Sequence, residues 1–271
     1  MRSIPIAVVR GAGDLGTGVA FRLWKAGFRV LCIDIEKPLV IRRMVAFASA
    51  LYAGRMVVEG VSATRISFVD EAHYLWQRDT LPVLADPVGR CIDVLKPQVV
   101  VDAIMAKRNI ADTHIAQAPV VIACGPGFEV GVHCHAAIET NRGHDLGRVL
   151  WNGKAEPNSG VPGKVDGEDN KRIVRAPVSG LMYGRKAIGD MVKVGQPIAS
   201  VGTTVVEAPL AGVLRGLIHD GLEVSFGMKI GDIDPRGVQR HCFTISDKAL
   251  AIGGGVLEAV MTMRGKWEDK S

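Results

Sequence analysis

Residues 6–36, IAVVRGAGDLGTGVAFRLWKAGFRVLCIDIE, decide the fold expected for the N-terminal half of the chain. The stretch opens on the apolar run IAVV at 6–9, which is typical of a buried parallel strand. The glycine pattern GAGDLG follows at 11–16, and a helix-like stretch then leads into a second apolar run at 28–33. Between a strand and a helix, such glycines permit a tight turn and let backbone amides approach a phosphate at the positive end of the helix. The stretch therefore predicts a Rossmann-like parallel-sheet domain.

The glycine loop is the first part of a predicted cofactor site. Asp34 lies 18 positions after Gly16, near where a carboxylate that binds a ribose belongs. Two further strand-like runs, at 98–104 and 120–124, end in loops at the sheet edge where open α/β sheets bind ligands. A phosphate-friendly turn does not identify its ligand, so NAD(P) and other phosphate-bearing cofactors remain candidates. The predicted cofactor-binding residues of these loops are Gly11, Gly13, Asp14, Leu15, Gly16, Asp34, Lys107, Gly125 and Gly127.

The segment HCHAAIETNRGHD at 133–145 is the densest polar cluster in the chain. In a strand, His133 and His135 share one face, and Glu139 shares it if the strand continues that far. Three interpretations stay open: a metal site, an acid–base or anion-binding pocket, and a hydrogen-bonded network that only supports the fold.

The metal interpretation would use His133, His135 and His144, but their spacing matches no specific zinc pattern, and we predict no metal site. In the acid–base interpretation, the predicted catalytic residues are His135, Glu139 and His144. The predicted anion-binding residues of the same segment are Asn141 and Arg142.

Residues 172–236 contain an internal repeat with an offset of 32 positions. Ala176-Pro177 recurs as Ala208-Pro209, and the turn glycines that follow recur at the same offset. Short apolar strands separated by glycine turns predict a compact all-β unit. The pair resembles the barrel-sandwich hybrid of biotinyl and lipoyl domains, in which a modified lysine lies on the hairpin between the two halves. Here that hairpin, SVGTT at 200–204, has no lysine, so covalent biotin or lipoate is not expected.

The remaining segments complete the predicted α/β plus β architecture. Residues 151–171 are rich in Gly, Pro, Asn and charge, as in a linker. Ser246 or Asp247 is suited to cap a C-terminal helix, although the glycines at 253–255 weaken it unless packing needs small residues. The predicted divisions are a Rossmann-like domain at 1–150, the linker at 151–171, the duplicated biotinyl/lipoyl-like β domain at 172–236 and a C-terminal segment with a helix at 237–271.

Composition and charge narrow the function classes. A net charge of +5 without a long basic run, with only 5% aromatic residues, argues against a nucleic-acid binder and is compatible with a small anionic cofactor. The five cysteines are odd in number and form no CxxC pair, which is typical of reduced, intracellular usage. The chain has no uninterrupted apolar run of about 18 residues and no signal-peptide pattern. A cytoplasmic protein that does not bind membranes is therefore predicted.

The chain resembles the YqeB family in the stretches VVRGAGDLGTGVAFRLWKAGF, CGPGFEVGVHCHAAIETNRGHDLGRV, IGDIDPRG and ISDKALAIGGGVLEAV. The resemblance spans roughly residues 4–264, and HxxxETNRGHxLGR is its most specific part. It implies an accessory or maturation protein of a selenium-dependent molybdenum hydroxylase, distantly similar to XdhC-type proteins. The implied ligand at the glycine loop is a pterin or nucleotide form of the molybdenum cofactor. The implied partner is a molybdenum hydroxylase or its maturation machinery.

Two other functions stay open on the residues alone. An NAD(P)-dependent oxidoreductase would use Asp34 on the ribose and His135 or His144 for proton transfer. A non-catalytic scaffold would use the β domain to dock a partner. Whether a reaction is catalysed, and whether the chain forms a homo-oligomer, is left open by the sequence.

Overall fold

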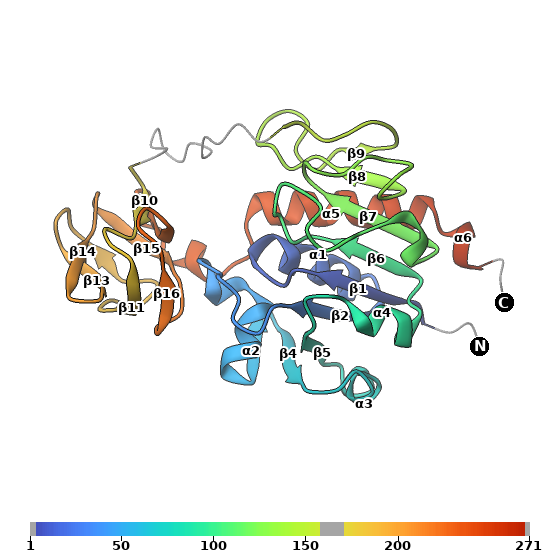
Figure 1. The fold of residues 1–271 in the computed structure, drawn as a ribbon, viewed down its shortest axis with the longest axis horizontal. Coiled ribbons are helices and arrows are strands. Elements are labelled where there is room, and N and C mark those ends of the chain that lie inside the picture. Colours follow the sequence, from blue (N-terminus) through green and yellow to red (C-terminus); the bar gives the residue numbers. More distant parts are fainter. Residues whose placement is uncertain (1–3, 158–170, 269–271) are drawn as a thin grey trace. The chain divides into compact units, whose positions relative to one another are not determined.

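The computed structural model describes residues 4–157 and 171–268, and Figure 1 shows the order of its elements along the chain. The chain divides into two compact units, each built from segments that are distant in sequence. Unit 1 comprises Met1–Pro38, Ala46–Ser159 and Ile245–Ser271, and unit 2 comprises Leu39–Val45 and Gly160–Thr244. The contiguous domain boundaries expected from the sequence stay a prediction, and residues 158–170 of the expected linker lie outside the described residues.

Unit 1 is built on a nine-stranded sheet. Its strands are β1 (Ile6–Arg10), β2 (Arg29–Asp34), β3 (Arg55–Val58), β4 (Val61–Ile66), β5 (Leu81–Ala85), β6 (Val99–Asp102), β7 (Val120–Cys124), β8 (Ala136–Ile138) and β9 (Val149–Leu150). Their order in the sheet is β3-β4-β5-β2-β1-β6-β7-β8-β9. All neighbours pair in parallel except β3 with β4 and β8 with β9, which are antiparallel. The central strands are fully buried, as shown by Val8 on β1 and Val100 on β6, so their apolar runs are continuous and not alternating.

The helices of unit 1 are α1 (Asp14–Lys25), α2 (Ala50–Ala53), α3 (Glu71–Trp76), α4 (Arg90–Leu95), α5 (Asp247–Thr262) and α6 (Gly265–Glu268). The C-terminal helix expected from the sequence is α5, and the Ser246 hydroxyl caps it by accepting a hydrogen bond from the Ala249 amide at 3.2 Å. In Figure 1, α5 runs in red beside the sheet. A Cβ on Gly18 of α1 would lie 2.5 Å from the Ala249 carbonyl oxygen, and one on Gly253 would lie 2.5 Å from the Gly18 carbonyl oxygen. Glycine therefore permits the close approach of these two helices. Among the described residues, no helix is long and apolar enough to cross a membrane.

The prediction of a Rossmann-like domain is wrong as a fold class. The sheet is large and mixed, with an antiparallel strand at each edge. The glycine loop is also packed within unit 1: the Ala12 amide donates to the Asp34 carboxylate at 2.8 Å, and the Ala12 carbonyl accepts from the Ala48 amide at 2.9 Å. A GxGxxG pattern specifies a tight turn before a helix, but it does not specify the strands added at the sheet edges or the segment that covers the turn.

Unit 2 contains two four-stranded antiparallel sheets. Its strands are β10 (Ile173–Arg175), β11 (Gly180–Gly184), β12 (Met191–Val192), β13 (Pro197–Val201), β14 (Thr204–Glu207), β15 (Gly212–Leu217), β16 (Leu222–Val224) and β17 (Lys229–Asp234). One sheet has the order β10-β17-β15-β12 and the other β14-β13-β11-β16. An offset of 32 residues converts β10, β11, β12 and β13 into β14, β15, β16 and β17. Each sheet therefore takes strands from both copies of the repeat, and the offset exchanges the two sheets.

The prediction of a biotinyl/lipoyl-like barrel-sandwich hybrid is also wrong. Unit 2 is not a free-standing duplicated module, because Leu39–Val45 completes it. The Leu217 amide donates to the Ile41 carbonyl at 2.9 Å, and a Cβ on Gly216 would lie 2.8 Å from that same oxygen. The Arg42 guanidinium donates to the carbonyls of His241 and Thr244, each at 2.9 Å. The repeat predicts short strands and turns, but it carries no signal for a segment contributed from more than a hundred residues earlier.

Candidate functional site

Four strands of the unit 1 sheet end in a carboxylate. Asp34 ends β2, Asp86 follows β5, Asp102 ends β6 and Glu139 follows β8. Each accepts hydrogen bonds from backbone amides: Asp34 from Ala12 and Ile35, Asp86 from Gly89 and Cys91, Asp102 from Ile104, and Glu139 from Thr140, Asn141 and Glu156. These carboxylates hold the loops at the carboxyl edge of the sheet, so much of that edge is engaged by the protein itself.

The surroundings shift the pKa of three of these carboxylates. Burial raises the pKa of Asp34 and of Asp102 above the usual carboxyl value. Burial also acts to raise the pKa of Asp86, but hydrogen bonds from the amides of Cys91 and its neighbours outweigh it, and the pKa is lowered.

Arg10, at the end of β1, ties the middle of this edge together. It is fully buried, and its Nη1 donates to the Thr113 hydroxyl at 3.1 Å. Its Nη2 donates to the carbonyls of Val88 at 3.0 Å and Ala111 at 2.7 Å. The Thr113 hydroxyl in turn donates to Asp102 at 2.6 Å. The guanidinium thus joins the end of β1 to two loops, one at Val88 and the other at Ala111 and Thr113.

The glycines of the predicted cofactor loop serve close packing. A Cβ on Gly11 would lie 2.7 Å from the Ala103 carbonyl oxygen, and one on Gly16 would collide with the Gly11 carbonyl. Asp34, predicted to bind a ribose, is hydrogen-bonded to the amide of Ala12 in this loop. The loop residues predicted from the sequence lie at the start of α1: Gly11, Gly13, Asp14, Leu15 and Gly16.

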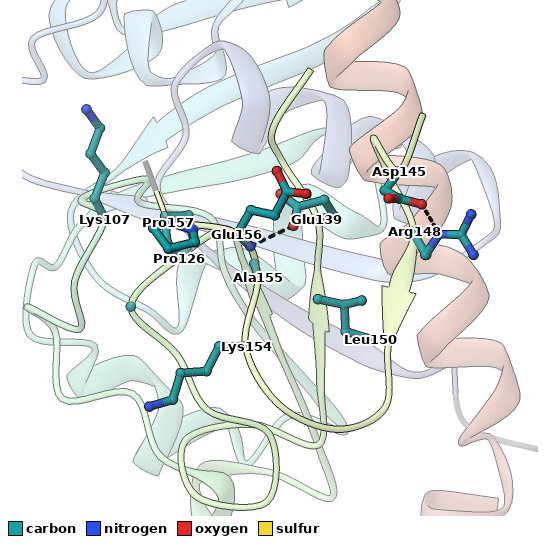
Figure 2. A pocket seen from close by; sticks show the side chains of 11 residues that line it. Lys107, Pro126, Glu139, Asp145, Arg148, Leu150, Lys154, Ala155, Glu156 and Pro157 are labelled. Atoms are coloured by element: carbon teal, nitrogen blue, oxygen red, sulfur yellow. Dashed lines mark hydrogen bonds and ion pairs between the residues drawn. The ribbon is translucent and has the colours of Figure 1, made fainter. Parts of the chain in front are cut away.

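A cavity of about 820 Å³ lies further along the same edge, beside β7, β8 and β9. Figure 2 shows Glu139 and Glu156 close together in this cavity, while the amines of Lys107 and Lys154 extend outward at its rim. Its lining residues are Lys107, Pro126, Gly127, Glu139, Asp145, Arg148, Leu150, Lys154, Ala155, Glu156 and Pro157.

Glu139 organises the wall of the cavity. Glu139 is only 3% exposed, and its Oε1 accepts hydrogen bonds from the amides of Thr140 and Asn141, both at 2.7 Å. Oε2 accepts from the Glu156 amide at 2.8 Å. The Asn141 side-chain amide donates to the Glu156 carboxylate at 2.6 Å. Glu139 therefore positions the chain on both sides of the cavity and is engaged as an acceptor.

The cations of the lining differ in their partners. Arg148 pairs with Asp145 at 2.6 Å, and Lys154 pairs with Glu129 at 3.1 Å. For the exposed Lys107, no hydrogen bond or ion pair is found among residues 4–157 and 171–268. The Lys107 amine is therefore the lining cation whose charge is not matched by a neighbouring carboxylate of the described chain.

The predicted catalytic residues are not brought together. His135 precedes β8 and Glu139 follows it, so the two lie at opposite ends of the strand, about 13 Å apart along an extended chain. The His135 Nδ1 accepts from the Val121 amide at 3.0 Å, and burial followed by the charge of Lys266 lowers its pKa. His144 is exposed on the loop after β8. Of the three, Glu139 lines the cavity.

The remaining predicted site residues fall at different places. Lys107 and Gly127 line the cavity. Asn141 holds Glu156, as described, while Arg142 forms two bonds to Asp247 of α5 at 3.1 and 3.4 Å. Gly125 adopts a φ of +82°, and a Cβ there would lie 2.7 Å from the Thr140 hydroxyl. Within the described ranges, no group of three His, Cys, Asp or Glu residues is placed to hold a metal ion.

Several lining residues were not identified from the sequence. Arg148, Lys154 and Glu156 flank β9. Arg148 falls within the Rossmann-like domain predicted at 1–150, and the other two fall within the linker predicted at 151–171. Their alternating charges, RVLWNGKAEP at 148–157, were the available signal. Charged residues in such a stretch are usually solvated, and only the return of the chain beside Glu139 makes them part of a cavity wall.

Solved structures show only a weak similarity to the chain. An aspartoacylase family protein from Mesorhizobium loti is 9% identical, with a TM-score of 0.26, and the match covers 86% of this chain and 85% of that protein's chain. A succinylglutamate desuccinylase/aspartoacylase from Rhodobacter sphaeroides is 13% identical, with a TM-score of 0.27, and covers 85% of each chain. The ectoine utilization protein EutE (DoeB) from Ruegeria pomeroyi is 11% identical, with a TM-score of 0.26, and also covers 85% of each chain. TM-scores this low transfer no activity.

The geometry of unit 1 corrects the predicted function, because the glycine loop expected to hold the cofactor is engaged within the protein. The Ala12 amide donates to the Asp34 carboxylate at 2.8 Å, and a Cβ on Gly11 would lie 2.7 Å from the Ala103 carbonyl oxygen. The prediction of a molybdenum hydroxylase accessory protein that binds its cofactor at the glycine loop therefore fails.

No family model matches the chain. The chain is 52% identical over 258 residues to YqeB of Escherichia coli (strain K12), which is described as uncharacterized. The match covers 95% of this chain but only 48% of YqeB, so the chain spans about half the length of that relative. The chain is therefore a homologue of YqeB over the segment that the two share, and the resemblance expected from its motifs is confirmed to that extent.

Proposed function

We propose that unit 1 binds a small anionic molecule, bearing a carboxylate or phosphate group, in the cavity beside β7, β8 and β9. The observation that supports this is the distribution of charge in the lining. Each lining carboxylate has a donor in the protein. Asp145 is paired with Arg148, Glu156 accepts from Asn141, and Glu139 accepts from three backbone amides. Lys107 has no such partner in the described chain, so an incoming anion meets an unmatched positive charge.

The size and place of the cavity support a small ligand. Its volume of about 820 Å³ falls within the range of small-molecule sites, roughly 300–1,000 Å³. It lies at the carboxyl ends of parallel strands, where the loops of an open sheet leave room for a ligand. The lining contains both signs of charge, which favours a polar metabolite over an apolar one.

The backbone around Lys107 supports a binding role for this loop. Lys107 and Met105 have φ values of +64° and +63°, in the left-handed region that side chains rarely adopt. Gly127 faces this loop, and a Cβ on it would lie 2.5 Å from the Arg108 Cα. The two loops are thus packed backbone to backbone, and unusual conformations of this kind cluster at binding sites.

The test is calorimetric titration of the full chain with inorganic phosphate, succinate and glutamate. At least one of them should bind, and Lys107→Met should weaken that binding about tenfold, equivalent to roughly 1.4 kcal/mol. The control is Lys37→Met, an exposed lysine of unit 1 outside the cavity lining, which should leave the affinity unchanged. Failure of all three anions to bind the wild-type protein, or equal affinity of the Lys107→Met variant, would overturn the proposal.

A cytoplasmic location is proposed on separate grounds. All five cysteines, Cys32, Cys91, Cys124, Cys134 and Cys242, are buried with free thiols. Free thiols persist in reducing compartments. Fractionation of the native host, with immunodetection of the full chain, tests the location, and recovery outside the cytosolic fraction would contradict it.

A further inference from the structure

The two copies of the repeat in unit 2 meet at a small cavity of about 240 Å³. Its lining consists largely of residues that are equivalent at the offset of 32. Val174 corresponds to Val206, and Pro177 corresponds to Pro209. The offset exchanges the two sheets, and equivalent residues of both copies line this one cavity, which points to a local twofold axis through it. We refer to this cavity as the repeat notch.

The one charged pair in this lining breaks the symmetry. Arg175 and Glu207 are also equivalent at the offset of 32, but they carry opposite charges. Both side chains are exposed, and Arg175 is oriented by donating to the Gly227 carbonyl at 2.9 Å. Among the described residues no ion pair joins Arg175 to Glu207. The repeat notch therefore presents a cation on one side and an anion on the other.

Two exposed apolar side chains near the repeat notch are also related by the repeat. Val194 and Phe226 are equivalent at the offset of 32, and they are 68% and 77% exposed. Each of them precedes a glycine whose amide donates to a residue adjacent in sequence to the lining: Gly195 donates to Ala208 and Gly227 to Ala176, each at 2.9 Å. Two large apolar side chains near the notch are thus exposed to solvent, as is common at protein–protein interaction sites.

We propose that this face of unit 2 joins two copies of the chain, with Arg175 of each copy opposite Glu207 of the other. A twofold axis that lies in the plane of the contact brings the positive side of one notch over the negative side of its partner, and both ion pairs form at once. A surface with a local twofold axis and opposite charges at equivalent positions is self-complementary, so charge selects a second copy as the occupant. Phe226 supplies the aromatic anchor on which such interfaces depend.

The test uses charge reversal in the full chain, with mass measured by light scattering after gel filtration across a range of concentrations. Wild-type protein should be a dimer. Arg175→Glu places two glutamates opposite each other, and Glu207→Arg places two arginines opposite each other, so each variant should be monomeric. A mixture of the two variants should form a heterodimer, because every contact then pairs opposite charges.

Two further variants separate docking from folding. Phe226→Ser should raise the dissociation constant about tenfold or more, whereas Arg185→Glu, which reverses an exposed charge of unit 2 outside the notch, should leave the dimer intact. Circular dichroism spectra should be unchanged in all variants. A monomeric wild-type protein, or single reversals that remain dimeric, would overturn the proposal. Single variants that stay monomeric when mixed would overturn it as well.

Discussion

Gly11 and Gly27 have nearly the same backbone conformation, with φ values of +89° and +90°, but different surroundings. A Cβ on Gly11 would lie 2.7 Å from the Ala103 carbonyl oxygen, whereas nothing lies within 4 Å of one on Gly27. Gly27→Ala should lower the free energy of unfolding by about 1 kcal/mol, the cost of a left-handed side chain. In Gly11→Ala the new Cβ would also overlap the Ala103 backbone, so this substitution should lower the free energy of unfolding by about 3 kcal/mol.

Urea unfolding followed by tryptophan fluorescence measures this difference in unit 1, which contains all four tryptophans of the chain. Equal losses for the two variants would show that the strand-end loops do not pack as tightly as described.

Glu139 gives a second prediction at the level of one side chain. Its carboxylate accepts from three backbone amides, and a carboxamide has only one oxygen to offer them. Glu139→Gln should therefore lower the free energy of unfolding of unit 1 by about 2 kcal/mol, because a buried N–H loses its acceptor. Glu258→Gln, at an exposed position of α5, is the control and should change it little. The same urea titration applies, and indistinguishable variants would rule out the organising role of Glu139.

Individual residues also show how far sequence reasoning reached the site. Lys107, Gly127 and Glu139 were predicted as site residues, and they line the same cavity. His135 and His144 were grouped with Glu139 because they are close in sequence. A three-residue strand separates His135 from Glu139, and extended chain moves residues apart by roughly 3.3 Å each. Proximity in sequence was therefore misleading for His135, which lies at the other end of the strand from Glu139.

At the scale of elements, the contact between α1 and α5 makes adjacent glycines behave differently. A Cβ on Gly253 would lie 2.5 Å from the Gly18 carbonyl oxygen, whereas nothing lies within 4 Å of one on Gly254. Gly254→Ala should raise the free energy of unfolding by about 1 kcal/mol through helix propensity. Gly253→Ala should lower it, because the helices must separate. Thermal unfolding monitored by tryptophan fluorescence compares the two, and stabilisation by both substitutions would contradict the described helix packing.

Elements were predictable where their signals are local. The strand before the glycine turn, the helix that Ser246 caps and the repeat of unit 2 all follow from neighbouring residues. The antiparallel edge strands and the grouping of strands into sheets were not predictable in this way. In unit 2 each sheet takes strands from both copies, so pairing joins residues that the repeat pattern treats as separate.

At the scale of the whole molecule, partly buried histidines make stability depend on pH. Burial is the first cause of a lowered pKa for His135 in unit 1 and for His219 and His241 in unit 2, and it brings His219 to about 4. A folded pKa below the unfolded value of about 6.5 favours the neutral form. The stability these groups contribute is therefore present above pH 6.5 and is lost as the pH falls through the folded pKa.

His135 allows this dependence to be measured in one unit. Its protonation removes the acceptor for the Val121 amide, and His135→Asn retains an oxygen acceptor without the titration. The melting temperature of unit 1, measured by tryptophan fluorescence, should fall less between pH 7 and pH 5 in this variant than in the wild-type protein. Asp34 and Asp102, whose pKa is raised, act in the opposite direction at low pH in both proteins, so the comparison isolates His135. Parallel pH profiles would show that His135 does not contribute.

The sequence by itself determined the local features of this protein: a buried strand that leads into a glycine turn and a helix, a capped C-terminal helix, a 32-residue repeat and the homology to YqeB. Periodicity, caps and turn residues act over a few neighbouring positions, so they can be read from the order of residues. Only the tertiary structure decided that Asp34 binds the glycine loop, that Leu39–Val45 completes unit 2, and that Lys107 and Lys154 share a cavity. Those contacts join residues distant in the chain, and no local pattern specifies which group will lie opposite another.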